Sequence, residues 1–83
     1  MPMFMDVHQK LPDGATAKDV ADAHAADLRV QEKFGVKYVN YWVDEANGKV
    51  FCLVDAPDAQ AAEACHREAH GLTADEIYEV QQG

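Results

Sequence analysis

Two histidines, His66 and His70, lie four residues apart near the end of the 83-residue chain, in the segment HREAHG. If this segment is helical, the two side chains lie on one face, one turn apart. Two imidazoles held in this way can bind one divalent transition-metal ion. A second interpretation stays open. Gly71 is typical of a helix end, and histidines in a last turn are favourable because they oppose the helix dipole.

Two other histidines and one acid extend this set of candidate metal ligands. His24 lies in the middle of a predicted first helix and could face His66 or His70 across the groove between two helices. His8 lies on a predicted first strand, with Asp6 on the same strand face. The alternative for His24 is a partly buried polar side chain that is bonded to a carbonyl. The predicted metal ligands are therefore His66, His70, His24, His8 and Asp6.

Carboxylates and thiols near these histidines would alter the choice of metal. Imidazole suits zinc, copper, iron and nickel, and nearby carboxylates broaden that range. The acids within reach of the predicted helices are Asp19, Asp22, Asp27 and Glu63. Cys52 is predicted to pack in the core, as a small buried hydrophobic residue. Cys65 is expected to lie on a different helix face from its neighbour His66.

Motifs for catalysis are absent from the sequence. Arg67 follows His66 where a zincin requires Glu, and no third histidine has the metzincin spacing. The chain also lacks a phosphate-binding glycine loop, a G-x-S-x-G motif and a Cys/His nucleophile pair with an evident orienting group. We therefore expect a binding protein and not an enzyme.

Hydrophobic patterning and turn residues predict six elements that position these side chains. Thr16 and Asp19 form an acidic variant of the capping box at a helix start, and Gly35 ends that helix. Asn47-Gly48 is a strong hairpin signal, and Pro57 suits the first position of a second helix. The predicted elements are a strand over 3–9, a helix over 16–34, strands over 36–43 and 49–54, a helix over 57–70 and a strand over 77–80.

This order predicts an α+β domain over residues 1–83 with the ferredoxin-like split βαβ fold. A four-stranded antiparallel sheet then carries both helices on one face. On the first strand we expect Met3, Met5 and Val7 to face the helices, which leaves Phe4, Asp6 and His8 on the open face. Because apolar area on an open sheet face is a partner surface or a pocket wall, we expect a homodimer through that face.

Charge and hydropathy exclude several classes of partner. Fifteen acids against seven bases give a net charge of −8, which repels nucleic acids and anionic lipid surfaces but attracts cations. No apolar run is long enough to span a membrane, and the first residues are not typical of a signal peptide. Two cysteines without a C-x-x-C motif favour free thiols in the reducing cytoplasm.

Three segments carry a resemblance to a known family. They run from His24 to Leu28 with 31–36, from Tyr41 to Ala59, and from His66 to Leu72 with 76–80. Together they resemble a small bacterial nickel-binding family with a ferredoxin-like fold, formerly a domain family of unknown function. The resemblance implies a homodimer that binds Ni²⁺, for sequestration or detoxification and not for catalysis. It also implies that His66 and His70, with His24, are the motif histidines.

The resulting order of hypotheses places a nickel-binding dimer first. An interaction or sensor module that uses the open sheet face comes second, because some members of the family are parts of larger regulatory proteins. A small dimeric enzyme, such as a monooxygenase or an isomerase, comes third. A closed, ligand-sized cavity between sheet and helices would favour that third hypothesis.

Overall fold

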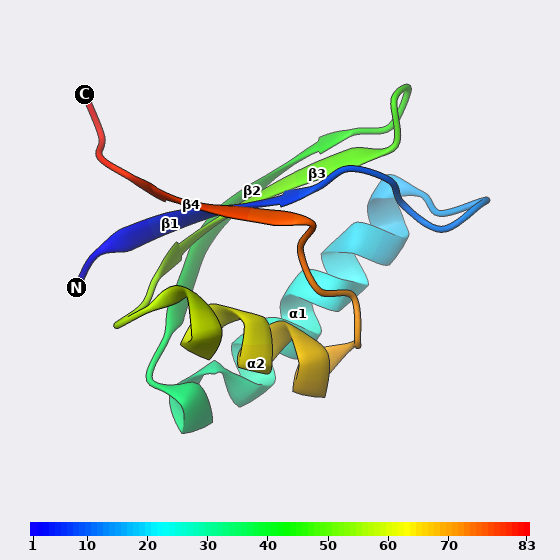
Figure 1. Cartoon of the computed structure of the whole chain (residues 1–83). Helices are drawn as coiled ribbons and strands as arrows, with labels where there is room; N and C mark the ends of the chain where they lie inside the picture. The colour runs from blue at the N-terminus through cyan, green and yellow to red at the C-terminus, as the bar shows by residue number, and fades with distance from the viewer.

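The computed structural model describes residues 1–83 and has the predicted order of elements (Figure 1). These elements are β1 (Met3–His8), α1 (Ala17–Phe34), β2 (Lys37–Asp44), β3 (Lys49–Asp55), α2 (Ala59–Ala69) and β4 (Glu76–Val80). The strands form one antiparallel sheet in the order β2-β3-β1-β4. Both helices cover one face of this sheet. The chain therefore has the predicted ferredoxin-like α+β fold.

Local capping explains where α1 begins and ends. The Asp19 N–H donates to the Thr16 hydroxyl, and the Thr16 N–H donates to the Asp19 carboxylate, which confirms the predicted capping box. Gly35 ends the helix with φ of 67°, a left-handed conformation that glycine adopts without steric cost. The predicted bounds of this helix are confirmed.

The start of α2 differs from the prediction. The N-cap of this helix is Asp58, whose carboxylate accepts the Ala61 N–H at 2.8 Å. Pro57 was wrongly assigned to the first helical position and lies one residue before the cap. At the other end His70 is the C-cap, so of the two histidines only His66 belongs to the last helical turn.

The predicted orientation of β1 is wrong. Phe4, Asp6 and His8 are buried and face the helices, whereas Met3, Met5 and Val7 are only partly buried on the open face. Alternation alone defines two strand faces but does not say which is inside. Phe4 joins the core, and Asp6 can be buried because it accepts a hydrogen bond and lies beside a histidine.

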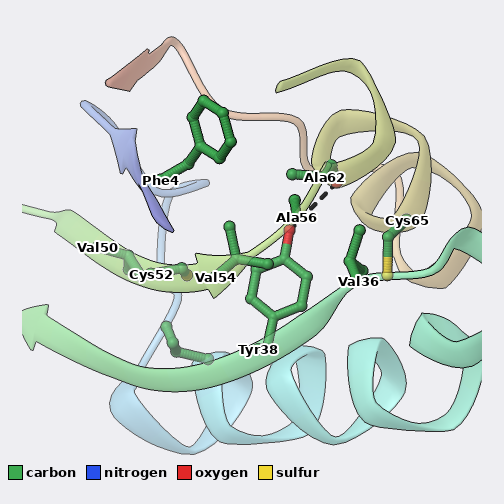
Figure 2. Close-up of a cluster of buried hydrophobic side chains, with 10 residues drawn as sticks. Phe4, Val36, Tyr38, Val50, Cys52, Val54, Ala56, Ala62 and Cys65 are labelled. Atoms are coloured by element: carbon green, nitrogen blue, oxygen red, sulfur yellow. Dashed lines mark hydrogen bonds between the residues drawn. The ribbon is translucent and has the colours of Figure 1, made fainter. Parts of the chain in front are cut away.

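The hydrophobic core lies between the sheet and the two helices (Figure 2). Its most deeply buried members come from β3, the β3–α2 connection and α2, namely Val54, Ala56, Ala62 and Cys65. Tyr38 on β2 points into this layer, and its hydroxyl donates to the Ala62 carbonyl at 3.1 Å. The alanines permit close approach of α2 to the sheet. Neither helix has the length and apolar character of a membrane span.

The opposite face of the sheet carries no helix (Figure 1). A shallow hollow on the molecular surface is formed there by apolar side chains of all four strands together with the segment that follows β4. Trp42 is half exposed, and Val39 is also exposed. Further apolar residues of this hollow are Met3, Met5, Leu53 and Val80. An apolar sheet face is therefore left without a partner within the chain.

Candidate metal centre

His66 occupies the centre of the polar cluster inside the domain. Its side chain comes from the last turn of α2 and is only 1% exposed. Nδ1 lies 2.8 Å from the Asp27 carboxylate on α1, and the N–H at this position donates to it. Nε2 lies 2.9 Å from an Asp6 oxygen on β1 but makes no hydrogen bond, so this contact is purely electrostatic. The imidazole thus bridges α1 and the sheet.

One set of possible metal donors lies on the sheet side of His66. Asp6 and Cys52 are directly paired across β1 and β3, and His8 lies two residues along from Asp6 on the same face. Donor atoms of His8, Cys52 and His66 all lie within 4.8 Å of one another. Asp6 Oδ1 and His66 Nε2 are buried without a hydrogen-bond partner. Such atoms are costly in a protein interior unless they bind something.

A second set lies on the helix side but is already satisfied by hydrogen bonds. Donor atoms of Asp27, His66 and His70 also lie within 4.8 Å of one another. His70 Nε2–H donates to Asp27 at 3.2 Å, while His70 Nδ1 accepts the Leu72 N–H at 3.0 Å. Both nitrogens of His70 are therefore engaged. A metal ion at Nε2 would force the proton onto Nδ1 and break the bond from Leu72.

Tyr38 holds the sheet side of the cluster in place. Its ring stacks on His66 with centroids 4.7 Å apart, and its hydroxyl lies 3.1 Å from Asp6 Oδ2 and from the Ala62 carbonyl. A single O–H can donate to only one of these acceptors at a time. Burial and the nearby Asp6 raise the pKa of Tyr38, so the hydroxyl keeps its proton and remains a donor.

The surroundings shift the pKa values of the central pair in opposite directions. Burial alone would lower the pKa of His66, but Asp27, Asp6 and Cys52 outweigh burial and raise this pKa to about 11. Burial would raise the pKa of Asp27, but hydrogen bonds from His66 and His70 hold it below its ordinary value. Without metal, His66 is therefore an imidazolium paired with a carboxylate.

His8 and Cys52, on the sheet side of His66, are neutral without metal. Burial and the neighbouring His66 lower the pKa of His8, so its imidazole is uncharged at neutral pH and keeps a free lone pair. Burial raises the pKa of the Cys52 thiol, although contact with His66 opposes this shift. A metal ion binds a cysteine as the thiolate and would therefore have to displace this proton.

The structure separates His24 from the other predicted ligands. Its ring packs against Tyr41 with centroids 4.6 Å apart, and its Nδ1 is buried without a partner. His24 belongs to neither of the two donor sets. Of the predicted ligands, His8 and His66 share one donor set with Asp6 beside it, whereas His70 belongs to the other set, with Asp27 and His66.

A cavity of about 360 Å³ connects this cluster to solvent. His8, Cys52 and His66 lie at its buried floor, and His24, Asp27 and His70 also line it. Its outer walls come from the β1–α1 loop, the first half of α1 and the α2–β4 loop. An ion could therefore reach the sheet-side donors without unfolding of the domain.

Two residues have a larger part in the cluster than the sequence suggested. Cys52 was predicted to pack in the core, where it lies, but it also lies beside His66 and Asp6. The strand register, once known, places it opposite Asp6. Asp27 was one of several acids within reach, but it is the residue that holds both His66 and His70. The sequence did contain a signal for this role, because Asp27 falls on the apolar stripe of α1 that faces the core. An acid is rarely buried there unless another side chain pairs with it.

Comparisons with known proteins link the chain to nickel. A sequence model of the family described as "Nickel responsive protein SCO4226-like" matches residues 4–80. The crystal structure of SCO4226 from Streptomyces coelicolor A3(2) is similar to this chain, with a TM-score of 0.88 and 40% sequence identity. The similarity covers 98% of each chain. No curated protein matches the chain.

Proposed function

Because the chain belongs to the SCO4226-like family of nickel-responsive proteins, we propose that it binds Ni²⁺ at the sheet side of His66. The residues that would hold the ion are His8, Cys52 and His66, with the Asp6 carboxylate beside them. The observation that carries this proposal is the buried Asp6 Oδ1, which has no hydrogen-bond partner and lies on the carboxylate that forms an ion pair with His66 Nε2. Nickel would supply a partner for Asp6 Oδ1 and would take the place of the proton on His66 Nε2.

The donor chemistry supports a borderline transition metal. Two imidazoles and a thiolate are ligands that nickel and zinc accept. The three donors lie within 4.8 Å of one another, and metal–donor bonds of about 2.0–2.3 Å would require them to approach further. The negative charges of Asp6 and of a Cys52 thiolate would together offset a doubly charged ion in the buried site. Asp27 would accept the Nδ1–H of His66 and orient its ring, as carboxylates commonly do behind a metal-bound histidine.

The role that we propose for this binding is nickel sequestration and not catalysis. The raised pKa of Cys52 argues against a free thiolate nucleophile, and neither the sequence nor the site contains a nucleophile with its own base and orienting group. We further propose a cytoplasmic location, which the two free, buried cysteines support.

Titration of the metal-free protein with Ni²⁺ tests the site directly. We expect one tightly bound ion per chain and a loss of at least tenfold in affinity for His8→Ala and for Cys52→Ala. Cys65→Ala is the matched control for the cysteine variant, because Cys65 is buried in the core but belongs to neither donor set. His24→Ala is the corresponding histidine control. Unchanged affinity in Cys52→Ala, or equal losses in both cysteine variants, would remove the site from this position.

We also propose that two copies associate through the open sheet face. The apolar hollow around Met5 and Trp42 carries only one charged side chain, Asp55, and an apolar face is complementary to a second copy of itself in a two-fold interface. Light scattering coupled to gel filtration should give a dimer for the wild-type chain and a monomer for Trp42→Lys. A wild-type monomer at all concentrations would contradict the proposal.

A sensor is the second candidate function, favoured by the family description "nickel responsive". A storage protein has no need to change its assembly when nickel binds, whereas a sensor must differ between its two states. The same light-scattering measurement with and without one equivalent of Ni²⁺ distinguishes them. An assembly state that does not change supports sequestration, and a nickel-dependent change supports the sensor.

A further inference from the structure

The cavity above the proposed nickel site is larger than an ion requires. Its volume of about 360 Å³ lies within the range of about 300–1,000 Å³ that small-molecule sites occupy. All the proposed nickel donors belong to the buried floor, on β1, β3 and α2. The space on the solvent side of this floor therefore contains no protein donor from the proposed set.

The walls of the cavity suit an organic molecule better than water. Apolar side chains line part of it, among them Leu11, Val20, Ala23, Tyr41, Val50 and Leu72. The polar partners that ordered water needs lie at the floor and the rim, and not along these apolar walls. The apolar walls would instead contact the body of a small organic ligand.

The aromatic residues of the cavity wall favour a ligand that contains a flat ring. Tyr41 and His24 pack together and form an aromatic part of the cavity wall. Aromatic ligands stack favourably on such a surface.

The negative charge around the cavity opposes the binding of anionic ligands. Three exposed acids line its rim, Asp13, Asp19 and Asp75, against the single cation Lys10. The nickel charge does not reverse this balance, because Asp6 and a Cys52 thiolate offset it at the floor. A carboxylate or phosphate would therefore be repelled at the rim, and a neutral ligand would not.

We propose that the cavity binds a neutral nitrogen heterocycle of one or two fused rings, whose unprotonated ring nitrogen faces the nickel held by His8, Cys52 and His66. This inference rests on the nickel site proposed above. The heterocycle nitrogen donates its lone pair to the ion without loss of a proton. The apolar side of the ring lies against the wall formed by Val20 and Ala23.

Three probe molecules of similar size test the ligand class by titration calorimetry of the nickel-loaded protein. Benzimidazole has an unprotonated ring nitrogen, indole has the same shape without that lone pair, and benzoate carries a negative charge. We expect benzimidazole to bind at least tenfold more tightly than either of the others. We also expect its affinity to fall at least tenfold when the protein is metal-free. Equal binding of indole, preference for benzoate, or equal binding to metal-free protein overturns the proposal.

A pair of variants on α1 tests the location. Ala23→Leu fills part of the cavity, whereas Ala21→Leu adds the same side chain at an exposed position of the same helix. We expect Ala23→Leu to weaken benzimidazole binding at least tenfold while nickel affinity stays within twofold, and Ala21→Leu to leave both unchanged. Retained benzimidazole binding in Ala23→Leu overturns the location. A chain that binds nickel but no benzimidazole overturns this inference alone, and one that binds no nickel overturns the proposed function as well.

Discussion

Asp27 binds both His66 and His70, and it lies on the helix side of His66, away from the other proposed nickel donors. It is 2% exposed, and its carboxylate accepts hydrogen bonds from both rings. By accepting the Nδ1–H of His66, it leaves Nε2 as the nitrogen from which a metal ion would displace the proton. Asp27 is therefore a positioning residue and not a ligand in our interpretation of the site.

Replacement of Asp27 by asparagine should separate positioning from packing. Asp27→Asn keeps the shape but removes the charge that favours a proton on Nδ1, and we expect nickel affinity to fall about 10–100-fold. Asp22→Asn, on the exposed side of the same helix, should leave it unchanged. Nickel titration at several pH values measures both. Unchanged affinity in Asp27→Asn, with a normal fold by circular dichroism, would contradict the positioning role.

The same pKa shifts predict how stability depends on pH in the metal-free protein. The pKa of His66 rises from 6.5 to about 11 on folding, so its stabilisation is complete below pH 6.5 and is lost between pH 6.5 and about 11. Asp27, whose pKa is lowered from 3.8, stabilises the fold above about pH 4 and loses this effect as the pH falls further. His8, with a lowered pKa, destabilises the fold below pH 6.5.

These three contributions together place maximum stability near pH 6.5. Urea unfolding at pH 6.5, 8 and 9.5 should therefore show a decreasing free energy of unfolding for the metal-free wild-type chain. His66→Gln lacks the titrating ring and should show a much flatter profile over the same range. A wild-type profile that rises or stays level above pH 6.5 would contradict the imidazolium assigned to His66.

At the residue scale, the sequence identified the participants better than their roles. Spacing pointed to His66 and His70 as a pair of ligands, because a helix places residues four apart on one face. The structure brings both rings to Asp27, but His70 lies beyond the helix end and is engaged at both nitrogens. Such tertiary contacts cannot be deduced from spacing, since they depend on how α1 packs against α2.

At the scale of elements, the features that depend on neighbouring residues were predicted correctly. The features that depend on packing between elements were not. The Thr16–Asp19 capping box and the left-handed Gly35 depend only on neighbouring residues, and both were predicted. The buried face of β1 depends on the partners available to Asp6 across the core. Only the structure shows that Tyr38 and His66 supply them. Without this information, Asp6 was assigned to the open face of the sheet.

The capping box of α1 gives a prediction at this scale. Thr16→Ala removes a hydroxyl that accepts the Asp19 N–H at the first turn, and should reduce the free energy of unfolding by about 1 kcal/mol. Thr73→Ala, in the exposed α2–β4 loop, removes the same groups without loss of a cap and should have an effect of less than about 0.5 kcal/mol. Urea denaturation measures both. Equal effects would mean that the cap contributes little to α1.

For the whole molecule, net charge and domain size both favour stabilisation by a bound cation. A charge of −8 on 83 residues creates an attractive field for Ni²⁺ and some self-repulsion in the folded state. A domain of this size buries only about 60% of its unfolded surface, so its stability is modest. The two proposed ligands of the folded chain, nickel and a second copy, would therefore have a large relative effect on its stability.

Nickel loading should accordingly raise the melting temperature of the whole domain. Free Ni²⁺ at a hundred times its dissociation constant adds about 2.7 kcal/mol to the free energy of unfolding. For a domain of this size that corresponds to an increase of roughly 10–20 °C, measured by calorimetry. A chelator should reverse the increase. Mg²⁺, which prefers oxygen ligands, should not reproduce it, and Cys52→Ala should lose most of it. Equal stabilisation by Mg²⁺ would indicate that the cation acts through net charge, because a site of two imidazoles and a thiolate discriminates between the two ions.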